Sequence, residues 1–425
     1  MSVADERRRP GRLFFEARGF GLWGQIVGEG NSRPAADLAE VGRGMQPTHV
    51  RRVNRRAVLS VICLQPGVSN AELARLTRLA PQTVSAVLAD LQRAHLITRG
   101  EVLRGRRGQP ATPVYMNPTG AFAVGAEIGW RHIEVCLVGL GAVTLARYRR
   151  AYAYPDARTV FVELGQAVAQ VTAGLSGAER ARLTGLGLAA PSGIGDPAML
   201  LAPPEGQTAA WAGLDMAAVA AQASGLRVAL YNDGNAACWA ERAAHPRPRP
   251  QNFAFLLVDT FLAAGIVAED RLWQGATGAS ANLGSMVVID RQGASRFVHD
   301  IASVHALRRR LAAAGHDADA PERAGAAPLV AEWVEDAAFA LAQTVLNVAT
   351  VLECRIAIVD SVLPRAITDA LVLATGRHVA AFPAPGRRSP RVVAGHLARS
   401  GAAEGAALLR LHRRYFSREY AHIEG

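Results

Sequence analysis

Three small polar side chains, Gln82, Thr83 and Ser85, follow Pro81 within a few residues. Their amide and hydroxyl groups donate and accept hydrogen bonds, and none of them is charged. Side chains of this kind recognise base edges in the major groove of DNA when the N-terminus of a helix presents them. These residues therefore predict hydrogen bonding to DNA bases. An ordinary helical hairpin within a larger domain is the alternative.

The stretch that carries these side chains, residues 69–96, has the pattern of two helices joined by a turn. Ser69 and Glu72 have the spacing of a capping box, which opens the first helix. Residues 77–80 form the turn, and Pro81 suits the first position of the next helix, where no N–H donor is needed. The apolar face expected for the first helix consists of Ala71, Ala74 and Leu76. The apolar stripe of the second helix, at helical spacing, consists of Val84, Val87, Leu88 and Leu91.

The flanking segments complete a recognisable domain. A helix is expected at 50–64, before Pro66-Gly67, and its start is crowded by arginines. After the helical pair, short β segments at 97–99 and 113–116 enclose a basic, glycine-rich loop. This order predicts a winged helix-turn-helix domain over residues 48–117, with three helices and one β-hairpin.

Arginine distribution supports a polyanionic partner for this end of the chain. All 47 basic residues are Arg, and their number reflects the Ala- and Gly-rich composition as much as any function. Their placement is more informative, because residues 1–117 hold 18 Arg against 9 acidic residues, whereas residues 118–425 hold 29 against 27. The excess of positive charge thus belongs to the N-terminal part.

We expect the arginines of this domain to contact DNA phosphates, with a solvated helix face as the alternative for those at the start of its first helix. One glutamine of the expected wing is predicted to enter the minor groove. The predicted phosphate contacts are Arg51, Arg55, Arg75, Arg106 and Arg107, and the minor-groove residue is Gln109.

Several other classes of protein are disfavoured. The four cysteines are far apart and form no C-x-x-C pair, so reduced, buried thiols in a cytoplasmic protein are expected. The longest apolar run, 337–352, contains Gln and Asn and is too short to span a membrane. Residues 1–47 lack a sustained period and are expected to form a mobile arm. An alternative start at Met45 would remove nearly all of it.

Beyond Pro118-Thr119-Gly120 the pattern changes to strands alternating with helices, and it recurs in two halves. Such a pattern predicts one bilobed α/β domain over residues 118–425, with largely parallel sheets and a cleft. The expected strands are 121–129, 133–138, 184–190, 227–231, 253–258 and 356–359. The expected helices are 159–173, 215–223, 236–243 and 328–351.

Six segments, in this order, resemble the ROK family of sugar-responsive repressors and sugar kinases. The resemblance covers roughly residues 48–415, and each segment alone is a weak signal. It implies an N-terminal winged helix-turn-helix followed by a bilobed actin-like ATPase (ROK/ribonuclease-H-like) domain. The segments are NRRAVLSVI with the helical pair after it, RRGQPA, GLGLAAPSG (185–193), YNDGNAACWAE (231–241), RLWQGATGASANLGSM (271–286) and SGAAEGAALL (400–409).

The sequence departs from the kinase branch at both phosphate loops. The first, D-x-G-G-T in the family, is EIGWR at 127–131, and the second, G-T-G-x-G-x-G, is DTFLAAG at 259–265. Phosphate loops need bare backbone N–H groups close to the phosphate oxygens. Because Trp130 and Phe261 fill that space and Asp259 adds negative charge, we expect no nucleotide cofactor and no catalytic residues.

The resemblance also implies a sugar site. Asp233 matches the family's catalytic base, and Asn232 precedes it; the alternative is that both only cap the following helix. Asn282 and Ser285 replace a sugar-contacting Glu and a His that the family also uses for zinc. Since residues 287–303 contain no cysteine and His299 is a lone histidine, no metal is expected.

These observations lead to one main hypothesis and two alternatives. The main one is a cytoplasmic DNA-binding regulator, a repressor, that binds double-stranded operator DNA as a homodimer or tetramer and senses a sugar-type effector without phosphorylating it. The alternatives are a ROK sugar kinase with an added DNA module, and a regulator whose C-terminal domain is only a scaffold.

Overall fold

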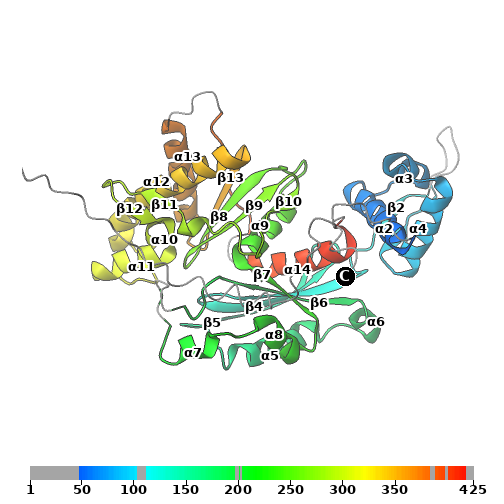
Figure 1. Cartoon of the computed structure of the whole chain (residues 1–425), viewed down its shortest axis with the longest axis horizontal. Coiled ribbons are helices and arrows are strands. Elements are labelled where there is room, and N and C mark those ends of the chain that lie inside the picture. The colour runs from blue at the N-terminus through cyan, green and yellow to red at the C-terminus, as the bar shows by residue number, and fades with distance from the viewer. Residues whose placement is uncertain are drawn as a thin grey trace, which may run out of the picture.

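A computed structural model describes residues 47–102, 112–196, 201, 203–382, 388–397 and 401–417. The three N-terminal helices form a small unit beside a larger body of two sheets and their covering helices (Figure 1). This arrangement confirms the predicted winged helix-turn-helix and bilobed α/β domain.

The winged-helix domain contains the predicted elements. Its helices are α2 (Pro47–Leu64), α3 (Asn70–Thr77) and α4 (Pro81–Arg93), and its hairpin pairs β1 (Ile97–Arg99) antiparallel with β2 (Val114–Met116). Both bonds of the capping box between Ser69 and Glu72 are present. All four residues of the predicted α4 stripe are buried. Helix α2 begins three residues before the predicted start.

The apolar face predicted for α3 is wrong. Leu73 is fully buried, whereas Ala71 is exposed and Leu76 is 38% exposed. The capping box sets the phase of the helix, and in this phase Leu73 points into the core formed with α2 and α4. Of the three predicted residues, only Ala74 packs against that core.

The first lobe is built on a five-stranded sheet of order β5-β4-β3-β6-β7. Its helices α5, α7 and α8 lie on one side of the sheet, and α14 lies on the other (Figure 1). The strands are β3 (Phe122–Ile128), β4 (His132–Gly139), β5 (Thr144–Ala151), β6 (Leu183–Ala190) and β7 (Val228–Asn232). The helices are α5 (Val160–Thr172), α6 (Gly177–Arg180), α7 (Gln207–Trp211), α8 (Met216–Ser224), α9 (Asp233–Ala244) and α14 (Gly401–Tyr415).

The second lobe repeats this plan, with a sheet of order β10-β9-β8-β13-β14. A small hairpin, β11 with β12, is added to it. The strands are β8 (Phe253–Val258), β9 (Leu262–Ala268), β10 (Arg271–Leu272), β11 (Val287–Ile289), β12 (Ser295–Phe297), β13 (Ile356–Ser361) and β14 (Arg391–Ala394). The helices are η1 (Leu283–Ser285), α10 (Val298–Ile301), α11 (Val304–Ala313), η2 (Ala324–Ala326), α12 (Ala327–Leu352) and α13 (Arg365–Ala381).

Both sheets are mixed, so the prediction of largely parallel sheets is wrong. In each lobe three strands joined by short turns run antiparallel, and only the strands reached through helices run parallel. Short connections permit antiparallel pairing, whereas parallel pairing needs a longer crossover. The same order in both sheets explains the repeated pattern in the sequence.

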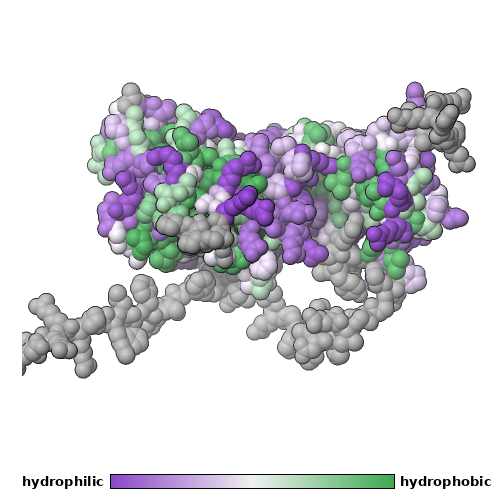
Figure 2. Space-filling view, turned by 90° about the horizontal axis from the view of Figure 1, so that it is seen from above, coloured by the Kyte–Doolittle hydropathy of each residue, from purple (hydrophilic) through white to green (hydrophobic). Residues whose placement is uncertain are grey.

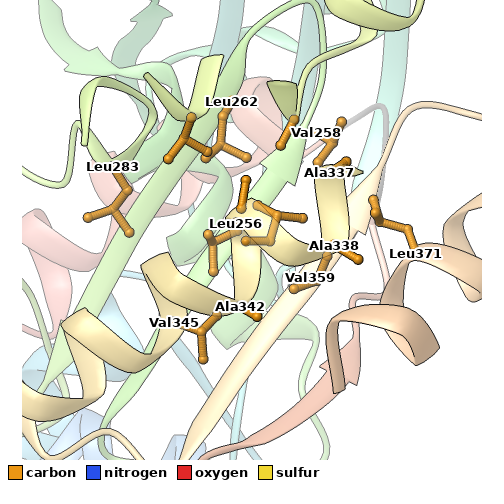
Figure 3. Close-up of a cluster of buried hydrophobic side chains, with 14 of the residues drawn as sticks. Leu256, Val258, Leu262, Leu283, Ala337, Ala338, Ala342, Val345, Val359 and Leu371 are labelled. Atoms are coloured by element: carbon orange, nitrogen blue, oxygen red, sulfur yellow. The ribbon is translucent and has the colours of Figure 1, made fainter. Parts of the chain in front are cut away.

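Small residues bring the last helix, α14, into the centre of the molecule. A Cβ atom at Gly125 of β3 would lie 1.9 Å from the carbonyl oxygen of Ala403, and one at Gly405 would lie 1.7 Å from that of Ala236. Helix α14 therefore touches β3 and α9 along their backbones. In the second lobe the core is larger, with α12 packed on β8 and β13 through Leu256, Val359 and Ala338 (Figure 3).

No helix in the described part of the chain is both long and apolar enough to cross a membrane. The cysteines of these residues are unpaired. Cys136, Cys238 and Cys354 are buried and Cys63 is half-buried.

Candidate functional site

The start of α4 presents the predicted base-contacting side chains to solvent. Gln82 is exposed and Thr83 is half-exposed, while Val84 beside them is fully buried. Pro81 occupies the first turn, and the preceding Ala80 makes no side-chain cap. The first N–H groups of α4 thus carry the partial positive charge of a helix N-terminus, which favours a nearby anion.

Ser85 has a second role inside the domain. Its hydroxyl donates to the carbonyl oxygen of Pro81 at 3.0 Å and accepts from Nδ2 of Asn70 at 2.8 Å. These bonds brace α3 against α4. A hydroxyl oxygen has two lone pairs, so one acceptor position remains for a base contact.

The arginines that were predicted to contact phosphates lie in different environments. Arg75 is exposed on α3. Arg51 is also exposed, but its Nη2 lies 2.8 Å from Oδ2 of Asp90, so it joins α2 to α4. Arg55 lines a pocket that faces α14. Arg106, Arg107 and Gln109 lie outside the described residues.

Arg56 belongs to the cluster of arginines at the start of α2, but its side chain does not face solvent. The side chain is 6% exposed and donates to the carbonyl oxygens of Ser417 at 2.8 Å and Arg414 at 3.2 Å. The last carbonyls of a helix lack partners within the helix. Arg56 supplies donors to the end of α14, and it thereby connects the winged-helix domain to the first lobe.

The two phosphate-loop positions are tight turns filled by aromatic rings. Trp130 follows β3 and Phe261 precedes β9, and they are 6% and 5% exposed. Their ring centroids lie 5.2 Å apart in an edge-to-face arrangement. In the second turn, the N–H of Asp259 donates to the carbonyl oxygen of Phe261, that of Thr260 to Oδ1 of Asp259, and that of Leu262 to Nδ1 of His299, so these three backbone donors are already used. This aromatic contact joins the two lobes.

Carboxylates surround the same place. The pKa of Asp233 is raised to about 7, first by burial and then by the negative charges of Glu127 and Asp259. Burial also raises the pKa of Asp259. Nε2 of His132 lies 3.3 Å from Oε2 of Glu127, and this carboxylate raises the pKa of His132 although burial opposes it. Aromatic rings stand at both phosphate-loop turns and carboxyl groups lie beside them, which is an unfavourable setting for the phosphates of a nucleotide.

The predicted sugar-contacting residues fall into two groups. Asn232 caps α9 by accepting from the N–H of Asn235 at 3.1 Å, and its Nδ2 donates to Oδ1 of Asp233 at 3.0 Å. The predicted capping role of Asn232 is therefore confirmed. Asn282 and Ser285 are exposed at either end of η1. Ligand contact by these four residues stays a prediction.

Zinc does not fit the position where the family implies it. His299 accepts from the N–H of Leu262 through Nδ1 at 3.2 Å and packs against Gly284, and burial lowers its pKa to about 4. It is thus a packed, hydrogen-bonded histidine. Residues 287–303 contain no cysteine. In the parts of the chain that the structure describes, no three His, Cys, Asp or Glu residues group to hold a metal.

Three features of these regions were not predicted from the sequence. The contact of Arg56 with α14 joins residues about 360 positions apart, and no local pattern indicates it. The pairing of His132 with Glu127 could have been suspected, because the two residues flank one tight turn. Trp130 and Phe261 were identified from the sequence, but their direct contact across the lobes was not.

Comparison with known proteins identifies the family. The profile of the ROK family matches residues 123–413, and a profile described as winged helix-turn-helix DNA-binding matches residues 51–98. The chain belongs to the ROK family. The resemblance to the ROK family and the winged helix-turn-helix domain predicted from the sequence are thereby confirmed.

Relatives of this ROK protein include regulators and enzymes. The xylose repressor of Bacillus subtilis is 23% identical over 57% of this chain and 62% of its own length, so the chain spans less than two thirds of that relative. The bifunctional enzyme NanE/NanK of Brucella suis is 30% identical over 31% of this chain and 25% of its own length.

Solved structures show the same fold. A ROK family transcriptional regulator, described as a homologue of the E. coli Mlc protein, has a TM-score of 0.65 at 20% identity, over 85% of this chain and 96% of its own. A ROK family glucokinase from Streptomyces griseus, in complex with glucose and AMPPNP, has a TM-score of 0.55 at 21% identity, over 68% and 99%. The C-terminal fold is therefore shared by a regulator and a kinase, and the residues at the loops must distinguish them.

Proposed function

We propose that this ROK-family protein is a cytoplasmic DNA-binding transcriptional repressor and that it does not phosphorylate a sugar. One contrast carries the proposal. The start of α4 presents uncharged polar side chains on an otherwise complete winged helix, whereas Trp130 and Phe261 close the phosphate-loop positions. A kinase needs those loops to bind its phosphoryl donor.

In this proposal Gln82 and Thr83 contact base edges, with Ser85 using its remaining acceptor position. Arg75 and the wing residues Arg106, Arg107 and Gln109 contact the DNA backbone and minor groove, and Arg51 does so beside its bond to Asp90. Two copies in a homodimer or tetramer would address a near-palindromic operator, because twofold symmetry in the protein matches twofold symmetry in the site.

The effector of the proposed repressor is a sugar-type molecule held by Asn232, Asp233, Asn282 and Ser285. The relative named a xylose repressor supports this class of ligand. Thermal-shift measurements with neutral sugars test it. Stabilisation by one sugar, lost in Asn282→Ala, supports the effector site. No stabilisation by any sugar tested favours a C-terminal domain that serves only as a scaffold.

DNA recognition is tested by fluorescence anisotropy on the native upstream region. We expect the double variant Gln82→Ala with Thr83→Ala to weaken specific binding at least tenfold, because each lost base contact costs about 1–3 kcal/mol. The control is Gln166→Ala with Gln170→Ala on the exposed face of α5, which should bind as the parent does. Equal affinity of the first variant and the parent would refute the recognition helix. Affinity should also fall steeply with salt.

Sugar phosphorylation is the second candidate, and one observation favours it. The pKa of Asp233, raised to about 7, suits a general base. A coupled ATPase assay with common hexoses as substrates distinguishes a sugar kinase from a regulator without catalysis. Turnover that disappears in Asp233→Asn would establish the kinase and overturn the proposed lack of catalysis.

A further inference from the structure

A small pocket lies at the junction between the winged-helix domain and α14. Its volume is about 160 Å³, below the range of about 300–1,000 Å³ typical of sites for drug-sized ligands. It has room for a compact group. The lining residues of this junction pocket are Arg52, Arg55, Arg56, Leu59, Leu91, Leu96, Arg414 and Tyr415.

One face of α2 contributes half of this lining. Residues 52, 55, 56 and 59 fall at i, i+3, i+4 and i+7, which places them along a single stripe of the helix. That stripe faces the end of α14, where Arg414 and Tyr415 stand. Leucines from the winged-helix core form the apolar part of the wall. The pocket is therefore built from both domains and exists only while they are docked.

The lining carries four guanidinium groups and, among the described residues, no carboxylate. The pKa of Arg56 is lowered first by burial and then by the positive charges of Arg414 and Arg52, so these guanidinium groups lie close together. Two of these guanidinium groups, those of Arg55 and Arg414, come from opposite domains, and a bound anion offsets the repulsion between them.

The geometry of the pocket is held by bonds that do not need a ligand. Arg56 is fixed by its two bonds to the carbonyls at the end of α14. Tyr415 keeps its phenolic proton at neutral pH, because burial raises its pKa although Arg414 and Arg55 oppose the shift. The pocket thus offers planar guanidinium donors and one hydroxyl donor around a preformed space.

We propose that the junction pocket binds the phosphate group of a small molecule, such as a phosphorylated metabolite. Guanidinium groups match the oxygens of phosphate in paired hydrogen bonds, and several of them together favour a dianion. The leucines close one side of the pocket, whereas Arg52 and Arg414 reach solvent on the other.

DNA is the other source of phosphate, and the position of the pocket disfavours it. Leu91 and Leu96 belong to the far end of α4 and the turn after it, whereas Gln82 and Thr83 stand at the beginning of α4. A small phosphate bound between Arg55 and Arg414 would instead tie the winged-helix domain to α14, which touches β3 and α9. Ligand binding would then stabilise one orientation of the two domains.

Isothermal titration calorimetry on the full chain without DNA tests the site, with inorganic phosphate and glucose 6-phosphate as probes and glucose as the uncharged control. We expect both phosphates to bind the parent and their affinities to fall at least tenfold in Arg414→Gln and in Arg55→Gln. The matched control is Arg365→Gln, an exposed arginine of α13 paired with Asp369, which should leave both affinities unchanged. Thermal unfolding checks that each variant is folded, and the second variant serves if the first is not.

Three outcomes would overturn the proposal. The first is that inorganic phosphate and glucose 6-phosphate fail to bind the parent at millimolar concentration. The second is that they bind Arg414→Gln and the parent equally. The third is that Arg414→Gln and Arg55→Gln weaken only operator binding in the anisotropy assay, which would make the pocket a DNA contact. Because the calorimetry is done without DNA, a failure to bind phosphate does not affect the proposed repressor function. Likewise, a failure of DNA recognition does not affect the proposed phosphate site.

Discussion

Single residues decide what the C-terminal domain can do. The kinase fold is retained, but Trp130 and Phe261 meet where bare backbone would have to approach a phosphate. An edge-to-face aromatic pair also contributes about 0.5–1.5 kcal/mol beyond the burial of its area. The two aromatic residues at the phosphate-loop positions therefore add a stabilising contact between the lobes.

The buried carboxyl group of Asp233 predicts that the protein becomes less stable as pH rises. Its pKa is about 7 in the folded protein and near 4 when unfolded, so between these values the folded state binds more protons. Stability therefore falls as pH increases from about 4 to 7. The raised pKa values of Asp259 and His132 act in the same direction. We expect a lower melting temperature at pH 8 than at pH 5.5.

Asp233→Asn separates this effect from general pH sensitivity. Asn keeps the Oδ1 acceptor used by the N–H of Gly234 but cannot ionise. The variant should melt above the parent at pH 8 and close to it at pH 5. Asp369→Asn, on the exposed face of α13, should show no such pH-dependent gain. An equal shift of Asp233→Asn at both pH values would contradict the argument.

For single residues, the sequence predicted chemical roles but did not predict which residues lie close together in the fold. It identified the residues that stand at the phosphate-loop positions, because the matching motif gives each position a role. It could not show that Glu127 and Asp259 raise the pKa of Asp233, since three separate elements bring these residues together. It likewise could not show that Ser85 is already bonded to Asn70.

The helices and strands were largely predictable from local signals. The capping box at Ser69, the proline at the start of α4 and its apolar stripe each act within a few residues, and all are as predicted. The mixed sheets were not predicted, because strand direction depends on which strands become neighbours. The face of α3 was also misjudged, because short helices with several small residues carry a weak periodic signal.

The corrected face of α3 makes a direct prediction for element stability. Leu73→Ala should lower the free energy of unfolding by about 2–5 kcal/mol, because it opens a cavity at a fully buried position. Leu76→Ala is the matched control on the same helix, and since that side chain is 38% exposed its cost should stay within about 1 kcal/mol. Urea unfolding followed by circular dichroism measures both. Equal losses would restore the face predicted from the sequence.

At the scale of the whole molecule, two domains share one core. The apolar cluster of the winged helix continues through Val138 of β4 to Ala407 and Leu411 of α14. Seen from above, hydrophilic and hydrophobic side chains are interspersed over both domains, so hydropathy of this face does not by itself mark a functional surface (Figure 2). What relates the domains is their contact at α14.

Arg56 is the residue on which that contact most depends. It is buried, it is charged, and it is bonded to two carbonyls of the other domain. Removing the guanidinium leaves those carbonyls without these donors, and an unsatisfied buried polar group costs about 1–3 kcal/mol. The intrinsic stability of each domain is affected less, because Val58 and Leu59 around it still fill the winged-helix core. The main effect of removing the guanidinium is therefore to weaken the contact between the two domains.

We expect Arg56→Ala to separate the unfolding of the two domains. In the parent, differential scanning calorimetry should show the winged helix and the first lobe unfolding together, since they share a core. In the variant, the winged-helix domain should unfold several degrees earlier, as a distinct transition. Arg99→Ala, which removes an exposed arginine bonded to Gln92 within the winged helix, should keep a single transition. A single transition of Arg56→Ala, shifted as a whole, would contradict this prediction. It would mean that the bonds of Arg56 to α14 stabilise the whole molecule and not specifically the contact between the two domains.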